Sequence, residues 1–495
     1  MPELKIRKNV ANGVERSRAK AVTPSTSQSL YAKRTQVYPK RVNGTFRKLK
    51  WFILIVLLGI YYITPWIRWD RGPLAPNQAV LIDFENARFY FFFIEIWPQE
   101  IYYLTGLLIL AALGLFLATA LFGRVWCGYA CPQTIWTDLF MAVERFFEGD
   151  RNARIRLDKA KWSASKVAKK TAKHAVWIYI SMLTGGAWIL YFHDAPTIAR
   201  DLLLGHAPLT AYTFLAIMTF VTYALAGFMR EQVCTFMCPW PRIQAAMIDD
   251  EALNVVYRHD RGEPRGAHKK GEAWDGRGDC IGCRQCIAVC PTGIVIRDGA
   301  QPECIGCALC IDACDEIMVK IGRPKGLIYY DTDANIERRL RGEKDEYNLF
   351  RPRILIYSAV FLAVGAVMLY SLLNRSELDM NVLRDRIPNF VRLSDGSIRN
   401  GYTVKILNKA THERELTLEA VGLDGVKISV VGLKKTDGSY TLYAPADQVL
   451  DYKAYLAITD VSKMPDSKVF FLRITDTKTG EVTQTETMFI TGKRK

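Results

Sequence analysis

Twelve cysteines are the residues of this sequence whose type and spacing can do chemistry, and all lie between positions 127 and 314. Eight of them form two runs, CIGCRQCIAVC and CIGCALCIDAC, with the spacing C-x2-C-x2-C-x3-C. This spacing is typical of bacterial [4Fe–4S] sites, in which three close thiolates and one distant thiolate hold each cluster. Zinc sites usually show two pairs of cysteines instead. The sequence therefore predicts a ferredoxin-like domain with two clusters.

The fourth cysteine of each run ligates the other cluster in such proteins, so the spacing also predicts the two ligand sets. The first [4Fe–4S] cluster is expected to take Cys280, Cys283, Cys286 and Cys314. The second is expected to take Cys304, Cys307, Cys310 and Cys290. Two neighbouring clusters pass single electrons, so this domain is expected to carry or store electrons.

Four further cysteines form two Cys-x3-Cys-Pro motifs, VWCGYACP and VCTFMCP, each directly after a long apolar run. Residues four apart on a helix share one face, so Cys127 is expected to face Cys131 and Cys234 to face Cys238. If both pairs lie at one membrane face, the four thiols can converge. Three interpretations stay open: a copper site, which soft sulfur ligands favour, a third iron–sulfur or other metal site, and plain reduced thiols.

The elements that position these cysteines are long apolar helices, because five runs approach the roughly 20 residues needed to cross a bilayer. These runs are 51–67, 101–122, 175–192, 209–228 and 354–373. Buried helices of a soluble protein are the alternative, and five runs without charged residues argue against it. We therefore predict a multidomain membrane protein with an α-helical transmembrane bundle of about five helices.

Basic residues orient this bundle, because cytoplasmic loops carry the excess of Lys and Arg. Residues 1–50 contain thirteen Lys and Arg and residues 149–174 contain nine, whereas 68–100 contains three and 193–208 contains one. The N-terminus and all cysteines are therefore expected on the cytoplasmic side, where thiols stay reduced or bind metal. The net charge of +16 gathers beside the apolar helices, which favours membrane topology and predicts no nucleic-acid partner.

The composition changes again near residue 385, where segments rich in Val, Ile, Thr and Tyr alternate with short turns. This pattern predicts six or seven strands in a C-terminal all-β sandwich of immunoglobulin type. The expected organisation has five parts. They are a basic cytoplasmic arm at 1–45, a four-helix membrane region with both Cys-x3-Cys-Pro motifs at 46–250, a cytoplasmic two-cluster domain with linkers at 251–350, a fifth transmembrane helix at 351–375 and a periplasmic immunoglobulin-like domain at 376–495.

Together these features resemble the FixG/RdxA/CcoG family of membrane ferredoxins, which are cytochrome oxidase accessory proteins. The resemblance covers nearly the whole chain and includes CGYACP, CTFMCP and the double ferredoxin run. The exported immunoglobulin-like tail separates this family from the shorter quinol-dehydrogenase ferredoxins that resemble NapH, which share the other motifs.

The resemblance implies a multi-pass protein of the bacterial inner membrane that helps to build cbb-type oxidases. It also implies cupric reductase activity, Cu(II) to Cu(I), with four candidate copper-reactive thiols, Cys127, Cys131, Cys234 and Cys238. The implied partners are membrane lipid, copper ions, oxidase subunits or their assembly factors, and an electron donor that the sequence does not identify. Two other functions stay open: a quinol dehydrogenase that supplies a partner reductase, and a non-enzymatic scaffold for oxidase assembly.

Overall fold

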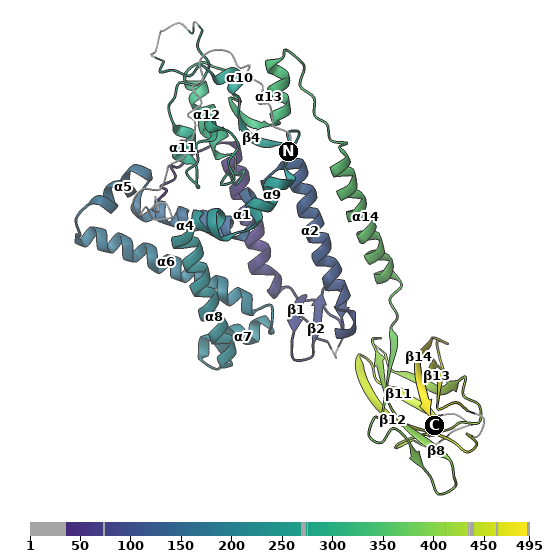
Figure 1. Ribbon diagram of the computed structural model, residues 1–495. Coiled ribbons are helices and arrows are strands. Elements are labelled where there is room, and N and C mark those ends of the chain that lie inside the picture. The colour runs from purple at the N-terminus through teal and green to yellow at the C-terminus, as the bar shows by residue number, and fades with distance from the viewer. Residues whose placement is uncertain are drawn as a thin grey trace, which may run out of the picture.

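The computed structural model of this chain describes residues 36–72, 75–268, 274, 276–410, 412–433, 435, 440–461 and 464–492. Most of the predicted basic arm, 1–45, therefore lies outside the described residues. Figure 1 shows a group of long helices in the middle of the molecule, the cysteine-rich domain at one end and a β-sandwich at the other end, which α14 connects to the rest.

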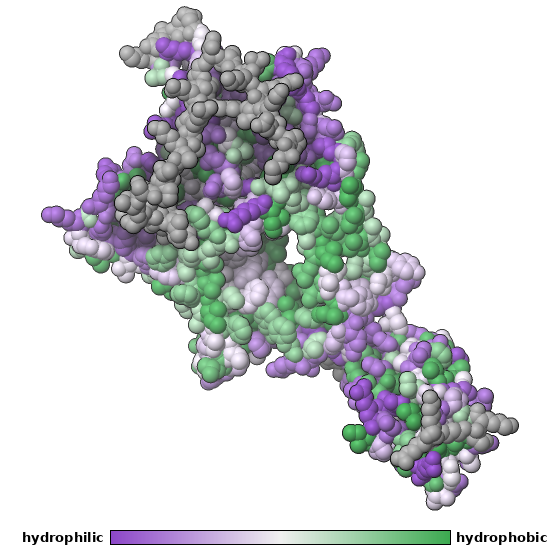
Figure 2. Space-filling model, in the orientation of Figure 1, coloured by the Kyte–Doolittle hydropathy of each residue, from purple (hydrophilic) through white to green (hydrophobic). Residues whose placement is uncertain are grey.

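Four helices in the described part of the chain are long and apolar enough to cross a membrane. Hydrophobic residues cover their outer surface, and hydrophilic residues dominate the cysteine-rich end (Figure 2). Contact of so continuous an apolar surface with water is unfavourable, whereas its contact with lipid chains is not. The helices are α1 (Thr45–Ile63), α2 (Tyr102–Phe122), α8 (Leu209–Thr222) with its π-helical continuation η3 (Tyr223–Met229), and α14 (Pro352–Leu373).

The fifth predicted span differs from the other four. The run 175–192 is the second half of α6 (Ala164–Ile189), whose first half, ASKVAKKTAKH, is strongly basic. Because of these charges, α6 as a whole is not counted among the apolar helices of the described residues, so four of the five predicted spans are confirmed by length and composition, and the run 175–192 is the apolar half of a longer helix. The apolar half of α6 packs along α8, and just after it Tyr191 Oη donates to the Tyr61 carbonyl oxygen of α1 at 2.9 Å.

Short elements join the long helices at both ends. A three-stranded antiparallel sheet, β1-β2-β3, lies between α1 and α2 in the chain. Its strands are Val80–Asp83, Arg88–Phe91 and Ile94–Ile96. The connecting helices are α3 (Val125–Tyr129), α4 (Pro132–Glu148), α5 (Arg151–Lys159), α7 (Ala195–Leu204), the π-helix η4 (Val233–Met237) and α9 (Trp240–Met247). Pro132 is the first residue of α4, a position where proline's missing N–H group needs no hydrogen-bond partner.

The cysteine-rich domain is built around a small antiparallel sheet, β4 (Asn254–Tyr257) with β5 (Ile328–Asp331). Two helices follow the two cysteine runs, α11 (Gln285–Val289) and α12 (Leu309–Lys320). Short helices α10 (His259–Gly262) and α13 (Asp333–Leu340) flank the sheet. The apolar core includes cysteines of both runs, so the two cluster loops belong to one folded unit.

The C-terminal part is an antiparallel sandwich of two sheets, ordered β10-β12-β8-β6 with β7 paired to β8, and β11-β9-β13-β14. This confirms the predicted all-β domain, with more strands than expected. Alternate residues of β8, such as Tyr402, Val404 and Ile406, are fully buried between the sheets. The strands are β6 (Leu378–Arg384), β7 (Val391–Arg392), β8 (Ile398–Asn408), β9 (Arg414–Val421), β10 (Lys427–Val430), β11 (Thr441–Ala444), β12 (Gln448–Ile458), β13 (Ser467–Asp476) and β14 (Val482–Ile490).

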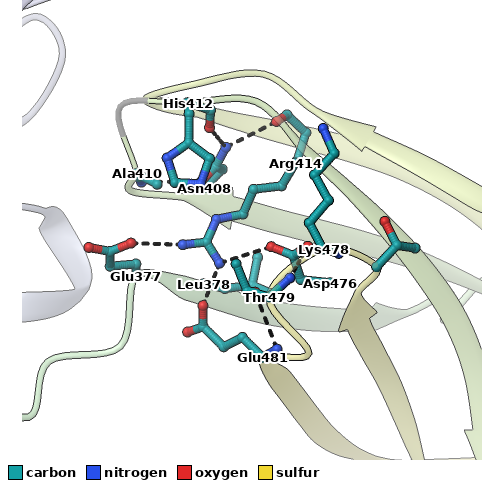
Figure 3. Close-up of polar contacts among 12 residues, drawn as sticks. Glu377, Leu378, Asn408, Ala410, His412, Arg414, Asp476, Lys478, Thr479 and Glu481 are labelled. Atoms are coloured by element: carbon teal, nitrogen blue, oxygen red, sulfur yellow. Dashed lines mark hydrogen bonds and ion pairs between the residues drawn. The ribbon is translucent and has the colours of Figure 1, made fainter.

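A buried arginine joins the sandwich to the chain that enters it from α14. Figure 3 shows the Arg414 guanidinium among the carboxylates of Glu377, Asp476 and Glu481. Its Nη2 atom lies 2.7 Å from Glu377 Oε2, and its side chain is only 3% exposed. A buried charge is costly unless it is paired. These three carboxylates therefore fix the segment before β6 against the end of β13.

Candidate functional site

The two ferredoxin runs fold into the same loop twice. Gly282 and Gly306 have φ angles of 68° and 67°, and the residues that follow the next cysteine, Arg284 and Ala308, have φ angles of 57° and 58°. Glycine enters this left-handed region without steric cost. Each loop then continues directly into a helix, α11 or α12. Repeated sequence thus gives a repeated turn that wraps its cysteines around a common centre.

Cys314 and Cys310 of the second run each lie close to thiols of the first run. Burial, the largest cause, raises the pKa of Cys314, and the neighbouring thiols that raise it further are Cys286, Cys283 and Cys280. Burial likewise raises the pKa of Cys310, and its thiol neighbours are Cys307, Cys304, Cys290 and Cys286. These neighbourhoods agree with the crossed ligand sets, which stay a prediction.

The residues around the second set fit an iron–sulfur cluster. A small cavity is lined by all four of its predicted ligands, Cys290, Cys304, Cys307 and Cys310. The backbone N–H groups of Gly306 and Leu309 donate to the sulfur atoms of Cys304 and Cys307. Such hydrogen bonds are one of the features that tune cluster potentials. A bound cluster would supply one-electron chemistry here.

No three Cys, His, Asp or Glu side chains of the described residues converge closely enough to hold a single metal ion. Thiols spread around a cavity suit a cluster of several irons better than one zinc ion, whose four ligands lie about 2.3 Å from it. Burial raises the pKa of Cys304 to about 12, so this thiol is neutral at pH 7 without a metal. The geometry therefore agrees with the iron–sulfur prediction.

The two Cys-x3-Cys-Pro motifs do not lie on continuous helices, and the prediction of one shared helical face is wrong. Cys131 follows the end of α3 with φ −61° and ψ 128°, and Cys238 follows the end of η4 with φ −77° and ψ 123°. Both backbones are extended because the next residue is proline, Pro132 or Pro239, which disfavours helical geometry in the residue before it. The second cysteine of each pair therefore turns out of the helix.

The four thiols of these motifs are nevertheless neighbours. Burial raises the pKa of Cys127 to about 12, and Cys131, Cys234 and Cys238 raise it further. Burial also raises the pKa of Cys234 to about 11, with contributions from Cys131 and Cys238. The Cys127 thiol donates to Gln244 Oε1 at 3.3 Å. Two hairpins thus place four half-buried thiols in one region, although they are not close enough in this structure to hold a single metal ion together.

The first motif packs directly against the second ferredoxin loop. A Cβ atom on Gly128 would lie 2.9 Å from the carbonyl oxygens of both Ile305 and Gly306. Tyr129 Oη donates to the Cys307 carbonyl oxygen at 3.3 Å. Glycine is the residue that permits so close an approach of two backbones. The extra thiols therefore lie beside the loop that carries the second predicted ligand set.

The arginine that precedes each motif has a different role in each hairpin. Arg124 donates to the carbonyl oxygens of Cys304 at 3.1 Å and Pro241 at 2.8 Å, and so joins both hairpins to the cluster loop. Arg230 instead pairs with Glu144 of α4 at 3.0 Å. Of the two, Arg124 is the one that hydrogen-bonds to the cluster loop, while Arg230 lines a small cavity together with Cys234.

A carboxylate inside the second ferredoxin run anchors the first membrane helix. The backbone N–H groups of Phe46 and Arg47 donate to Asp312 at 3.2 and 2.7 Å, so a residue of α12 caps the start of α1. Sequence reasoning missed Asp312, Gly128 and Gln244. Their partners lie more than a hundred residues away, and the glycine between two cysteines was the only local signal.

Family models match three parts of the chain. A "4Fe-4S dicluster domain" matches residues 229–333, and a "4Fe-4S binding domain" matches residues 104–149. An "IG-like fold at C-terminal of FixG" matches residues 368–492. The chain thus contains two iron–sulfur domain matches, and its tail is the immunoglobulin-like domain that the strand pattern predicts.

Relatives match over most of the chain. It is 51% identical over 458 residues to "Nitrogen fixation protein FixG" of Rhizobium meliloti (strain 1021), covering 87% of each. It is 52% identical over 439 residues to "Protein RdxB" of Cereibacter sphaeroides, covering 88% of this chain and 91% of that protein. A crystal structure of a FixG-related protein from Vibrio parahaemolyticus covers 23% of this chain at 24% identity, and 96% of its own chain, with a TM-score of 0.20, too low to support a statement about fold. Identity near one half over nearly the full length confirms the predicted resemblance, and the chain belongs to the FixG/RdxA/RdxB family of iron–sulfur electron-transfer proteins.

Proposed function

We propose that this protein is a membrane-bound metal reductase that converts Cu(II) to Cu(I) and thereby supports assembly of a cbb-type oxidase. The observation that carries the proposal is that the first Cys-x3-Cys-Pro motif, whose thiols neighbour those of the second motif, packs directly against a ferredoxin ligand loop. The thiols belong to Cys127, Cys131, Cys234 and Cys238. Soft sulfur ligands favour Cu(I), so such a site stabilises the product of the reduction.

The reaction needs one electron for each copper ion and no proton on copper. The eight ferredoxin cysteines, in the two crossed sets, are the ligands we assign to the [4Fe–4S] clusters, which supply single electrons when bound. The chain positions the copper substrate beside that domain through Gly128 and Arg124, both of which contact the second loop. A reduced electron-donor protein or a quinol has to supply the electrons.

We infer that the ferredoxin domain is cytoplasmic and that the C-terminal domain is periplasmic, in the inner membrane of a bacterium. The excess of Lys and Arg beside the cysteine-rich end supports this orientation. At the other end, Arg88 of β2 forms an ion pair with Asp447 of the C-terminal domain at 2.7 Å. The β1–β3 sheet joins α1 to α2 at the helix ends opposite the cysteines (Figure 1). The C-terminal domain contacts this sheet, so it lies at the other end of the long helices from the ferredoxin domain.

Copper reduction by the isolated protein tests the proposal. Anaerobically purified full-length protein is reduced with dithionite, desalted, and mixed with Cu(II) and a Cu(I)-specific chelator. We expect about two Cu(I) per chain, because each of two clusters releases one electron. The double variant Cys127→Ser/Cys131→Ser is expected to lose this reaction, and Ala130→Ser, which adds a hydroxyl to the same motif, is expected to keep it.

Iron content is measured on the same samples. Full copper reduction by the double variant, at unchanged iron content, would remove the thiols from the mechanism. A fall in iron together with activity would point instead to a third iron–sulfur group. That second candidate is favoured by the two family matches, because 104–149 and 229–333 each include one Cys-x3-Cys-Pro pair. About twelve irons per chain would support it, and about eight would support two clusters.

A cavity between α6 and α8 favours quinol oxidation as another candidate function. Its volume is about 620 Å³, and it is lined by aromatic side chains together with His193 and Asp194. This is a usual size for a small-molecule site. The cavity lies at the end of α8 away from Cys234, so we rank quinol oxidation below copper reduction. Reduction of the clusters by a quinol analogue, without copper turnover, would favour it.

A further inference from the structure

A second large cavity lies where α1 meets α4, away from the four thiols. Its volume is about 730 Å³, within the usual range for ligand sites. One part of its lining is basic, with Arg41, Arg47, Lys48 and Arg145. The other part is apolar, with Trp51, Phe52, Ile55 and Phe146. A cavity that is cationic at one end and apolar at the other suits an amphipathic anion.

The cationic end contains buried nitrogens that lack a partner. Arg47 is only 7% exposed, and its Nη1 binds Asp138 at 2.8 Å. Among the described residues no acceptor reaches Arg47 Nη2 or Arg145 Nε, although both atoms are buried. Burial lowers the pKa of Arg145 to about 10 and the charge of Arg47 lowers it further, while Asp138 and Asp150 oppose this shift, so Arg145 is cationic at pH 7. Asp138 pairs with Arg47, but the two nitrogens without an acceptor leave hydrogen-bonding capacity that an anion in the cavity can fill.

The apolar end is open to the lipid side of the molecule. Phe52 and Ile55 of α1 are 65% and 64% exposed, and Phe146 of α4 is 82% exposed. The residues of α1 belong to a helix apolar enough to cross a membrane. Trp51 lies between the two ends, with the Arg47 guanidinium 4.9 Å from its ring centroid. Aromatic residues prefer this level of a bilayer, between headgroups and chains.

We propose that this cavity binds the phosphodiester headgroup of an anionic phospholipid, with the acyl chains along Phe52 and Ile55. Guanidinium groups bind phosphate oxygens in a bidentate manner, and basic pockets between helices on the cytoplasmic side recognise such headgroups. The backbone N–H group of Arg47 also donates to Asp312 of the ferredoxin domain. A lipid bound to the Arg47 side chain is therefore connected to that domain through a single residue, and it helps to hold the domain against the membrane.

Native mass spectrometry of the full-length protein tests this site. The protein is released from nanodiscs that contain phosphatidylglycerol or phosphatidylcholine of the same chain length. We expect wild-type protein to retain phosphatidylglycerol selectively. Arg145→Gln and Lys48→Gln should each weaken retention roughly fivefold, the effect of one basic side chain near an anionic surface. Arg145→Lys keeps the charge and should retain most of the binding, and Lys161→Gln, an exposed basic residue outside the cavity, should have no effect.

Three outcomes would overturn the proposal. They are equal retention of both lipids, equal retention by wild type and by Arg145→Gln at unchanged thermal stability, and complete displacement of the lipid by millimolar inorganic phosphate. The last outcome would identify a site for free anions. Copper reduction is not part of this test, so its result is independent of the proposed reductase function.

Discussion

At the residue scale, the middle of the first Cys-x3-Cys-Pro motif matters as much as its thiols. Gly128 lies against backbone atoms of Ile305, Gly306 and Cys307, and not against flexible side chains. The prolines act on their neighbours, since each turns the preceding cysteine out of the helix. Small residues thus decide where the thiols point and how near the ferredoxin loop can come.

Gly128→Ala is therefore expected to separate the motif from the loop. The new Cβ would lie 2.9 to 3.0 Å from three backbone atoms, closer than carbon normally approaches, and these atoms can move only with the loop. We expect about 1–3 kcal/mol of destabilisation, as for other overpacked sites, and slower copper reduction. Thermal unfolding and single-turnover copper reduction measure the two effects.

Gly186→Ala is the matched control, because nothing lies within 4 Å of its added methyl group. Within helix α6 this change should stabilise slightly, by up to about 1 kcal/mol. Equal behaviour of the two variants would show that the Gly128 contact has no part in the site.

At the element scale, α1 begins where another domain supplies its cap. Gly44 precedes the helix, and the helix has no side-chain cap of its own. The Asp312 carboxylate accepts the N–H groups of Phe46 and Arg47 instead. Free N–H groups and the helix dipole both favour an anion at this position. The start of a membrane helix and a cluster-binding helix are thereby coupled.

Asp312→Ala should loosen the first turn of α1. Loss of a cap costs about 0.5–2 kcal/mol, so faster amide hydrogen exchange is expected at residues 46–48. Glu316→Ala removes an exposed carboxylate of the same helix, which pairs only with Lys320 among the described residues, and should leave that exchange unchanged. Unchanged exchange in Asp312→Ala would contradict the capping role.

At the scale of the whole molecule, the C-terminal domain is held to the membrane region by charged contacts. Arg88 of β2 lies between Glu95 of β3 at 2.9 Å and Asp447 at 2.7 Å. Lys409 of the sandwich forms a second ion pair, with Glu100 at 2.8 Å. The two carboxylates share one guanidinium, which offsets only part of their mutual repulsion. Burial and the charge of Asp447 therefore raise the pKa of Glu95 to about 7.

This raised pKa makes the contact depend on pH. A carboxyl group that binds its proton more tightly in the docked state stabilises docking below its ordinary pKa of 4.5, and this stabilisation is lost as the pH rises through about 7. Hydrogen exchange of β1–β3 should therefore accelerate between pH 5 and pH 8 beyond the intrinsic effect of pH.

Glu95→Gln, which imitates the protonated acid, should remove this additional dependence. Glu85→Gln, at an exposed position in the turn between β1 and β2, should retain it. If the Glu95→Gln variant kept the full pH dependence, the titrating group would be a residue other than Glu95.

Features that depend on local pattern were predictable from the amino-acid order. Spacing alone predicts the eight ferredoxin cysteines as cluster ligands, because a cluster-binding loop is a short, continuous piece of chain, and the family match confirms the iron–sulfur domain around them. Apolar runs identified four membrane helices, and alternation identified the sandwich. The fifth run, 175–192, is the apolar half of α6, and the amino-acid order did not show that the basic segment before it belongs to the same helix.

Features that depend on contacts between distant segments appeared only in the folded molecule. Spacing could propose that Cys127 and Cys234 meet, but their convergence follows from the packing of two hairpins on one ferredoxin loop. Arg124 and Arg230 look equivalent in sequence, yet only Arg124 reaches that loop. Gly128 and Gly306 are 178 positions apart. Local periodicity carries no information about such a contact, because shape complementarity between separate elements creates it.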